Sequence, residues 1–308
     1  MEGARTVTIL MGLYQGARHL RSQLDSFATQ DHADWRLVVS DDGSQDEGPA
    51  ILAAFAATRP DGQVVWTTGP GRGFAANYQS LLAALPDEPG WVAFSDQDDV
   101  WLPDRLSRGL RALTEAGPAL YCSRTWVTAA DLTGRQMSPL FRRPPSFRNA
   151  LVQNVAAGNT ILLNPAAARL LVATARVAPA VVAHDWWAYL MVTGAGGSVF
   201  QDTEPTLLYR QHGGNTIGSN SGWRARLRRL QQVWAGRLRD WNDANAAALG
   251  ASLEHLSPEA RALFADWKRM RASRPALLRL WRLARLRLYR QTFASAAVLW
   301  LAAATGRL

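Results

Sequence analysis

The 308-residue chain has one cysteine, Cys122, so no disulfide can form within a single copy. A chain without disulfides is typical of a reducing compartment. Cys122 directly follows the apolar residues 119–121, which predicts a buried and unreactive thiol rather than a nucleophile. We therefore expect no chemistry at this thiol.

Long hydrophobic runs are also absent from the sequence. The best candidate, residues 293–304, is shorter than the roughly 20 apolar residues that a helix needs to cross a bilayer. The N-terminus enters a strand-like segment, residues 7–10, without the basic and apolar regions of a secretory signal. We therefore expect a cytoplasmic protein with no single-helix membrane span.

Lysine is nearly absent, since Lys268 is the only one and arginine supplies the other basic side chains. The net charge of +9 is unevenly distributed. Residues 1–220 carry 17 basic and 20 acidic side chains, a balance of −3, whereas residues 221–308 carry 17 basic and 5 acidic ones, a balance of +12. We therefore expect one large domain over residues 1–220 and a basic, Trp-rich helical extension over residues 221–308, each with its own partners.

Strand-like and helical patterns alternate through the first 118 residues. The apolar runs predict strands over residues 7–11, 36–40, 64–67 and 91–94, and the spacing between them predicts helices over 19–29, 46–57, 74–85 and 104–115. This alternation is typical of an α/β fold, in which helices cover a largely parallel sheet. Residues 119–220 are less regular, with predicted strands over 119–125 and 160–163.

The most informative stretch is Ser95-Asp96-Gln97-Asp98-Asp99, which follows the apolar run 91–94. In an extended segment residues two apart face the same side, so Asp96 and Asp98 are expected to point at one ligand. Mg²⁺ and Mn²⁺ prefer carboxylate oxygens, and Mg²⁺ usually completes its shell with substrate phosphates and water. A solvated turn before the next helix is the alternative interpretation.

A second acidic pair, Asp41-Asp42, ends another apolar run, residues 35–39. In open α/β sheets, ligands bind just beyond the carboxyl ends of the strands. We therefore expect the acidic ends of the second and fourth strands to converge on one site for a metal ion and a diphosphate.

The acidic motif also fits a different class of enzyme. Residues 96–100 match the nucleophile motif of haloacid-dehalogenase-like phosphohydrolases, in which Asp96 would be the covalent nucleophile and Asp98 a general acid. That motif ordinarily ends the first strand and needs a downstream lysine, whereas here it ends the fourth strand and Lys268 lies in the basic extension. A phosphohydrolase is therefore kept as an alternative. The loop Gly69-Pro70-Gly71-Arg72-Gly73 lacks both the spacing and the position of a dinucleotide-binding loop.

Several motifs in order carry a family resemblance, namely residues 7–16, 23–26, 39–46, 73–78, 95–104, 158–160, 184–187 and 209–215. Together they resemble the family 2 glycosyltransferases with the GT-A fold, most closely their rhamnosyltransferase-like bacterial branch. The resemblance covers about residues 6–218. It implies a Rossmann-like mixed sheet flanked by helices, with a nucleotide-sugar half over residues 1–118 and an acceptor half over residues 119–220.

The resemblance also implies roles for individual residues. It implies that Asp98 binds Mg²⁺ or Mn²⁺ and that Asp185 is the catalytic base of an inverting transfer. The residues that it places at the nucleotide sugar are Leu13, Tyr14, Asp42, Gly73, Asp96, Asp99, Arg210 and His212, the last two as a lid over the diphosphate. Those that it places at the acceptor are Asn159, His184, Trp186 and Trp187. The implied donor is linked to dTDP or UDP, with dTDP-rhamnose as the specific candidate.

The extension contains a basic amphipathic helix over residues 277–290. The helical period puts Leu277, Leu280, Trp281, Ala284 and Leu288 on one face and most arginines opposite. Such helices are typical of membrane surfaces, so residues 274–308 are expected to contact an anionic membrane and a lipid-linked glycan acceptor on its cytoplasmic side. Packing on the core is the alternative. Nucleic-acid binding is a third hypothesis, although the chain has no recognisable module for it.

Overall fold

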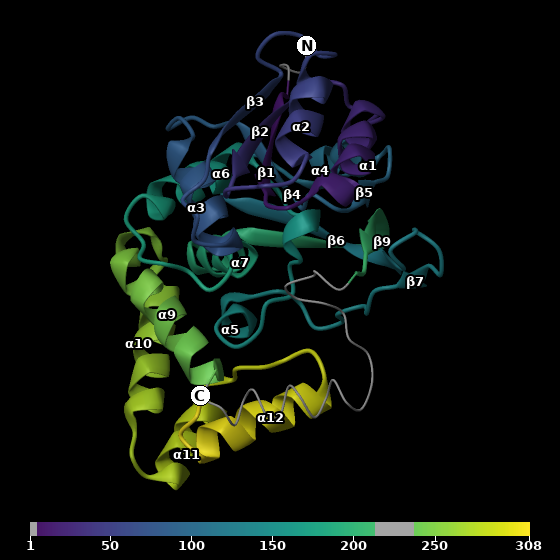
Figure 1. Cartoon of the computed structure of the whole chain (residues 1–308). Helices are drawn as coiled ribbons and strands as arrows, with labels where there is room; N and C mark the ends of the chain where they lie inside the picture. The colour runs from purple at the N-terminus through teal and green to yellow at the C-terminus, as the bar shows by residue number, and fades with distance from the viewer. Residues whose placement is uncertain (1–4, 213–236) are drawn as a thin grey trace.

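The computed structural model describes residues 5–212 and 237–308, and a nine-stranded mixed sheet forms its centre (Figure 1). The order of strands is β3-β2-β1-β4-β8-β6-β9-β5, with β7 paired to β6. Strands β1 to β4 run parallel, β8 is antiparallel to both of its neighbours, β9 is parallel to β6, and β5 is antiparallel to β9. The bounds are β1 Val7–Leu13, β2 Trp35–Asp41, β3 Val64–Thr68, β4 Trp91–Ser95, β5 Val100–Trp101, β6 Ala119–Thr128, β7 Gln136–Met137, β8 Leu162–Leu163 and β9 Ser198–Arg210.

Helices cover both faces of this sheet, as the alternating pattern predicts. Because side chains alternate along a strand, Ile9 and Met11 of β1 pack with α1, α2 and α4, whereas Leu10 packs with α3, α6 and α7. The bounds are α1 Ala17–Ala28, α2 Gly48–Ala56, α3 Phe74–Ala84, α4 Arg105–Ala112, α5 Phe147–Ala150, η1 Gly158–Thr160, α6 Pro165–Ala175 and α7 His184–Gly194. The predicted α/β class is therefore confirmed.

The described part of the extension is helical and packs beside α7 (Figure 1). Its elements are α9 Arg237–Ala251, η2 Leu253–His255, α10 Pro258–Ala272, α11 Ala276–Leu286 and α12 Phe293–Ala304. Phe264 and Leu283 belong to the same buried cluster as Leu190 of α7. A Cβ atom added at Gly194 would lie 2.7 Å from Leu256 Cδ2, so the two parts meet closely. The expected boundary at residue 220 lies outside the described residues.

A membrane span was not expected, and within residues 5–212 and 237–308 no helix combines the length and the apolar character that crossing a bilayer requires. The apolar run over residues 293–304 forms α12, which buries Leu299, Ala302 and Ala303 against the rest of the extension.

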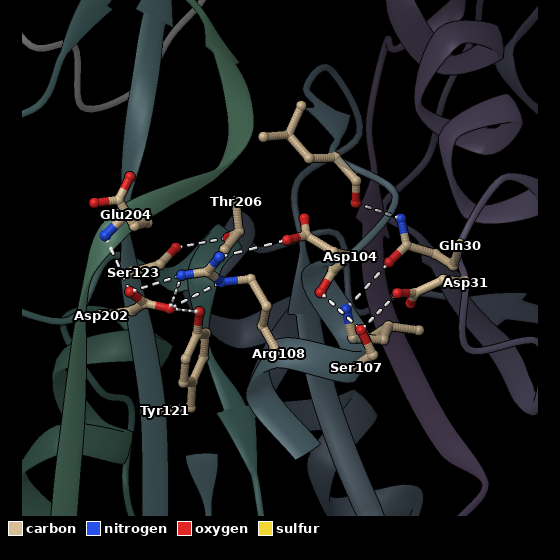
Figure 2. Close-up of polar contacts among 12 residues, drawn as sticks. Gln30, Asp31, Asp104, Ser107, Arg108, Tyr121, Ser123, Asp202, Glu204 and Thr206 are labelled. Carbon is tan, nitrogen blue, oxygen red and sulfur yellow. Dashed lines mark hydrogen bonds and ion pairs between the residues drawn. The ribbon is translucent and has the colours of Figure 1, made fainter. Parts of the chain in front are cut away.

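A polar network joins α4 to strands β6 and β9 (Figure 2). The Asp202 carboxylate accepts hydrogen bonds from Arg108 at 3.0 Å, from the Tyr121 hydroxyl at 2.8 Å and from the Glu204 N–H at 3.0 Å. Burial would raise the pKa of Asp202, but these donors lower it below its usual value. Asp202 therefore anchors α4 to β6 and β9 as a carboxylate.

Replacing Asp202 with asparagine is expected to lower the free energy of unfolding by about 2 kcal/mol, because Arg108 loses its charged partner in a partly buried setting. Urea titration at pH 7.5 would measure the change. Glu88→Gln is a matched control, since the Arg169–Glu88 pair is exposed and should change stability by less than about 1 kcal/mol. The lowered pKa of Asp202 stabilises the fold above about pH 4, so the difference between wild type and Asp202→Asn should shrink as the pH falls below that value. Equal unfolding midpoints for the two variants would contradict this role.

Candidate functional site

The acidic ends of β2 and β4 lie at one edge of the sheet. Both strands run parallel to β1, which separates them, so their carboxyl ends point the same way. The Asp42 N–H donates to Leu13 O at 2.8 Å. The Gln97 side chain accepts from the Tyr14 N–H and donates to Tyr14 O, both at 2.8 Å. The expected convergence of the two strand ends is therefore confirmed, and Gln97 ties the acidic motif to β1.

The carboxylates of Asp96, Asp98 and Asp99 form a tight group, with one oxygen from each lying within 4.8 Å of the others. Burial, followed by repulsion from Asp98 and Asp185, raises the pKa of Asp96 to about 7. Burial and the neighbouring carboxylates also raise the pKa of Asp99 well above its usual range. Ionising such a group is costly without a cation, and an all-oxygen donor set fits Mg²⁺ or Mn²⁺.

Asp99 is the completely buried member of the acidic group. Its side chain is completely buried, and one oxygen accepts from Asn159 Nδ2 at 2.6 Å while the other accepts from the Arg210 N–H at 3.2 Å. Asn159 is itself only 5% exposed, and its carbonyl oxygen accepts from the buried Arg105 side chain at 2.6 Å. The expected contacts of Asp99 with the sugar and of Asn159 with the acceptor therefore need correction, because both side chains are already buried against each other.

Arg210 is the last residue of β9, and its side chain is held in buried hydrogen bonds rather than placed to close over the diphosphate as part of a lid. Its guanidinium donates to Asp98 O at 2.9 Å and to Ser22 Oγ at 3.0 Å, and the residue is 5% exposed. Burial lowers the pKa of Arg210, with the charges of Asp98 and Asp99 opposing the shift. The Gly-Gly segment of the expected lid, from residue 213 onward, lies outside the described residues.

His212 is placed directly beside the acidic group. Its Nε2 atom lies 2.7 Å from Asp98 Oδ2, and its ring packs 5.0 Å from that of His19. An imidazole nitrogen at this position can share a cation with Asp98, because imidazole and carboxylate groups both ligate divalent metals. His212 is therefore in direct contact with one carboxylate of the candidate metal site.

Asp185 lies at the start of α7 and is the one residue of that helix that is only partly buried. Burial raises its pKa to about 6, although hydrogen bonds from Trp186, Asn154 and Gly158 act in the opposite direction. The Trp186 N–H donates to Asp185 Oδ1 at 2.7 Å. The ring of His184, the neighbour of Asp185, lies 5.0 Å from that of Phe94 in β4, so the start of α7 lies beside the strand that leads to Asp96. In agreement with this placement, the charge of Asp185 raises the pKa of Asp96. A carboxylate with a pKa near neutrality is suited to accept a proton.

His184 is a packing residue and does not face an acceptor. Its ring stacks on Tyr78 with a centroid distance of 3.7 Å, and burial lowers its pKa to about 3, so it stays neutral. Neither ring nitrogen has a hydrogen-bond partner among the described residues. A Cβ atom at Gly158 would lie 2.8 Å from His184 Nε2, which explains why glycine is needed there.

Trp186 and Trp187 are also misassigned by the sequence. They are 7% and 1% exposed, and Trp186 Nε1 donates to Ala150 O at 2.7 Å. Trp186 holds α7 against α5, and Trp187 is buried in the core, so we reassign both rings from acceptor contact to packing.

Asp42 organises the glycine-rich loop that follows β3. Its two carboxylate oxygens accept from the N–H groups of Gly71 at 2.7 Å and Gly73 at 2.8 Å. Gly73 has a φ of +85°, a conformation that side chains with a Cβ atom rarely adopt. Asp42 therefore fixes the loop, in addition to any contact with a base.

A cavity of about 290 Å³ opens at the ends of the first three strands. Its lining consists of Leu13, Asp41, Pro49, Leu52, Trp66, Thr67 and Thr68. Trp66 is half exposed there, and Tyr14, 57% exposed, follows Leu13 at the tip of β1. Trp66 was not predicted as a site residue, because the sequence places it inside an apolar run and does not report that its side chain is exposed. An aromatic wall beside apolar side chains suits a flat ring such as a nucleotide base.

The comparisons with known proteins agree with this geometry. The family model described as "Glycosyl transferase family 2" matches residues 8–168. A "dTDP-rhamnosyl transferase RfbG" of Shigella flexneri is 25% identical over 229 residues, which cover 72% of this chain and 78% of the relative. A "UDP-Glc:alpha-D-GlcNAc-diphosphoundecaprenol beta-1,3-glucosyltransferase WfgD" of Escherichia coli is 23% identical over 166 residues, or 52% of this chain and 62% of the relative. The structure of S. aureus TarS 1-349 in complex with UDP-GlcNAc superposes with a TM-score of 0.55 at 13% identity, covering 97% of this chain and 90% of TarS, so the two share a fold.

Proposed function

Because the chain belongs to glycosyl transferase family 2 and is a glycosyltransferase with the GT-A fold, we propose that it transfers a sugar from a nucleoside diphosphate to an acceptor hydroxyl with inversion. The observation that carries this proposal is the close group of Asp96, Asp98 and Asp99, with Asp185 near enough to influence the pKa of Asp96. One side of the site can hold a cation, and the other side can accept a proton. Inverting transfer in a single displacement needs both.

The proposed roles follow from these positions. Mg²⁺ or Mn²⁺ held by Asp98, with His212 beside it, would neutralise the charge that the diphosphate gains on departure. Asp185 accepts the proton of the acceptor hydroxyl as that oxygen attacks the anomeric carbon. Asp99, Asn159 and Arg210 keep Asp98 in place through their buried hydrogen bonds.

The finer identity of the substrates rests on the relatives. The name of the Shigella flexneri relative supports dTDP-rhamnose as the donor, and that of the Escherichia coli relative supports an acceptor carried on a lipid diphosphate. With a lipid-linked acceptor, the enzyme would act at the cytoplasmic face of the plasma membrane, where its basic extension would contact the anionic surface. The phosphohydrolase alternative is not favoured, because Lys268, the only lysine, lies over the Phe264 ring on α10. Nucleic acid is not a proposed partner.

Calorimetric titration of a panel of nucleotide sugars with Mg²⁺ or Mn²⁺ tests the donor assignment. We expect dTDP- and UDP-linked sugars to bind and GDP-linked sugars to bind weakly. Trp66→Ala should weaken donor binding by about tenfold, since stacking of a base on an aromatic ring contributes about 1–3 kcal/mol. Trp300→Ala is the matched control, because Trp300 is 41% exposed on α12 and does not line the cavity. Equal affinities for both variants would reject the cavity as the base site.

A further inference from the structure

An open groove of about 600 Å³ lies where α5 meets α11. Its lining consists of Arg148, Trp281, Ala284, Arg285 and Arg287, and we call it the arginine groove. Three of the five lining residues are arginines, and none is acidic. A pocket of this composition attracts an anion with several oxygens, because guanidinium groups match phosphate in shape and charge.

Other arginines of the extension are occupied with structural contacts. Arg279 donates to Ala303 O at 2.6 Å and to Ala304 O at 2.7 Å, which satisfies carbonyls at the end of α12. Arg282 donates to Arg269 O at 2.9 Å, and Arg271 forms an ion pair with Asp243 at 2.7 Å. Many charges of the extension are therefore used in contacts within the protein, and the extension does not present a uniform basic face.

The arginines of the groove differ in this respect. Within residues 5–212 and 237–308, no carboxylate forms an ion pair with Arg148, Arg285 or Arg287. The Arg148 guanidinium donates to Leu286 O, and that of Arg285 lies 4.8 Å from the Trp281 ring centroid. These contacts hold the side chains without neutralising them, so their charge is available to a ligand.

The backbone also fixes the groove. Arg287 ends α11 in the left-handed conformation, with φ +51° and ψ +34°. A non-glycine residue in this region is disfavoured and persists where the surroundings hold it. The buried neighbour Leu286 and the bond from Arg148 to its carbonyl supply that support.

An apolar stripe continues from the groove along α11. Leu277 is 82% exposed and Trp281 is 54% exposed, and both lie on the same helix face as Ala284 and Arg285. The side that packs on the core is formed by Leu283 and Leu286 instead. The predicted apolar face is therefore wrong in part, since Leu277, Trp281 and Ala284 point to solvent while the packed face lies beside it.

We propose that the arginine groove binds the phosphate headgroup of an anionic membrane lipid, with Leu277 and Trp281 reaching into the apolar boundary of the bilayer. A basic site beside an exposed Trp and Leu is the pattern of a helix that lies in a membrane interface. The inference rests on the proposed function, because a lipid-linked acceptor requires the enzyme at a membrane. The α5 helix, which carries Arg148, also accepts the Trp186 Nε1–H bond from α7, so a bound surface would be held at a fixed position relative to Asp185.

The test is flotation of the full-length protein with vesicles, without donor or metal, so that its outcome is independent of sugar transfer. We expect binding to vesicles of phosphatidylglycerol and phosphatidylcholine, and little binding to phosphatidylcholine alone. The double variant Arg285→Gln/Arg287→Asn should bind the anionic vesicles about 30-fold more weakly. Asparagine is chosen at position 287 because it tolerates the left-handed conformation. Deleting residues 274–308 is a poorer test, since it would remove the buried Leu283 and Leu299 from the core.

The control double variant Arg135→Gln/Arg239→Gln removes the same charge from exposed positions outside the groove. It should float like the wild type, and thermal melting should show both variants folded. Equal losses in the two double variants, or wild-type flotation of the groove variant, would overturn the proposal. Binding of inorganic pyrophosphate to the groove without flotation of the protein on anionic vesicles would also overturn it, by assigning the groove to a soluble ligand.

Discussion

Replacing Asp98 with asparagine is expected to reduce kcat by about a thousandfold or more while the protein stays folded. The substitution removes a charged ligand of the proposed cation. In metal-assisted transfer, such a cation typically lowers the free energy of the transition state by several kcal/mol, because it neutralises the developing negative charge. The fold should not suffer, because Asp98 lies in a group of like charges whose mutual repulsion it increases. Asparagine keeps an oxygen toward His212 and lowers that repulsion.

Thermal melting separates this role from a structural one. Mn²⁺ should raise the Tm of the wild type, since a cation relieves the repulsion among the three carboxylates, and it should raise that of Asp98→Asn much less. Asp104→Asn is the matched control, because Asp104 lies outside the group of three carboxylates, is partly exposed, and makes no helix-capping bond with its side chain. Unchanged turnover of the wild type in excess EDTA would defeat the metal assignment.

The first half of the fold could be predicted from the sequence because its pattern is strong. Strands β1 to β4 are apolar runs closed by polar residues, and each observed strand lies within two residues of its predicted bounds. The half after residue 118 gave weaker signals. All of α7 except Asp185 is buried, so it lacks the polar face on which helical periodicity depends. A strand was predicted over residues 160–163, but Thr160 ends a short 3₁₀ turn, Gly158–Thr160, and the strand is limited to Leu162–Leu163.

The position of the candidate site could be predicted from the sequence, but the roles of its individual side chains could not be predicted. Asp98 and Asp99 are adjacent and chemically identical, yet only the structure shows that Asp99 is buried against Asn159 and the Arg210 backbone. Arg210 looked like a phosphate ligand for the same reason, since a pattern of residue types does not report burial. Gln97 gave no chemical signal at all, because its role is a pair of hydrogen bonds to the backbone of Tyr14, distant in sequence.

The extension shows the same limit. Its composition predicted arginine-rich amphipathic helices, which are present, and it left membrane contact and core packing as alternatives. The structure contains an extensive packed face, with Phe264, Trp267 and Leu283 in the main core, and an exposed stripe beside it. The α11 helix has a packed apolar stripe and an exposed apolar stripe. Both repeat with the helical period, so the sequence pattern alone does not show which of them packs on the core.

Asp185→Asn is expected to lower kcat by about 10²–10⁴-fold, the usual contribution of a positioned general base. It should bind the donor normally, since Asp185 is assigned to the acceptor hydroxyl. The pH profile gives a second readout. With a pKa of about 6, Asp185 in the wild type is a carboxylate at neutral pH, and the rate should fall about tenfold for each pH unit below 6 as the base becomes protonated. The residual activity of the variant should lack this acidic limb.

Stability distinguishes the loss of a base from the loss of the fold. Burial raises the pKa of Asp185, so the folded protein holds this proton more tightly than the unfolded chain does. The stability that this proton confers is present below about pH 4 and is lost as the pH rises through about 6. At pH 7.5 the buried charge is a cost, and a neutral asparagine that still accepts the Trp186 N–H should melt at the same temperature as the wild type or higher. A variant that melts normally and still transfers sugar at a near-wild-type rate, with the acidic limb intact, would assign the base to another residue.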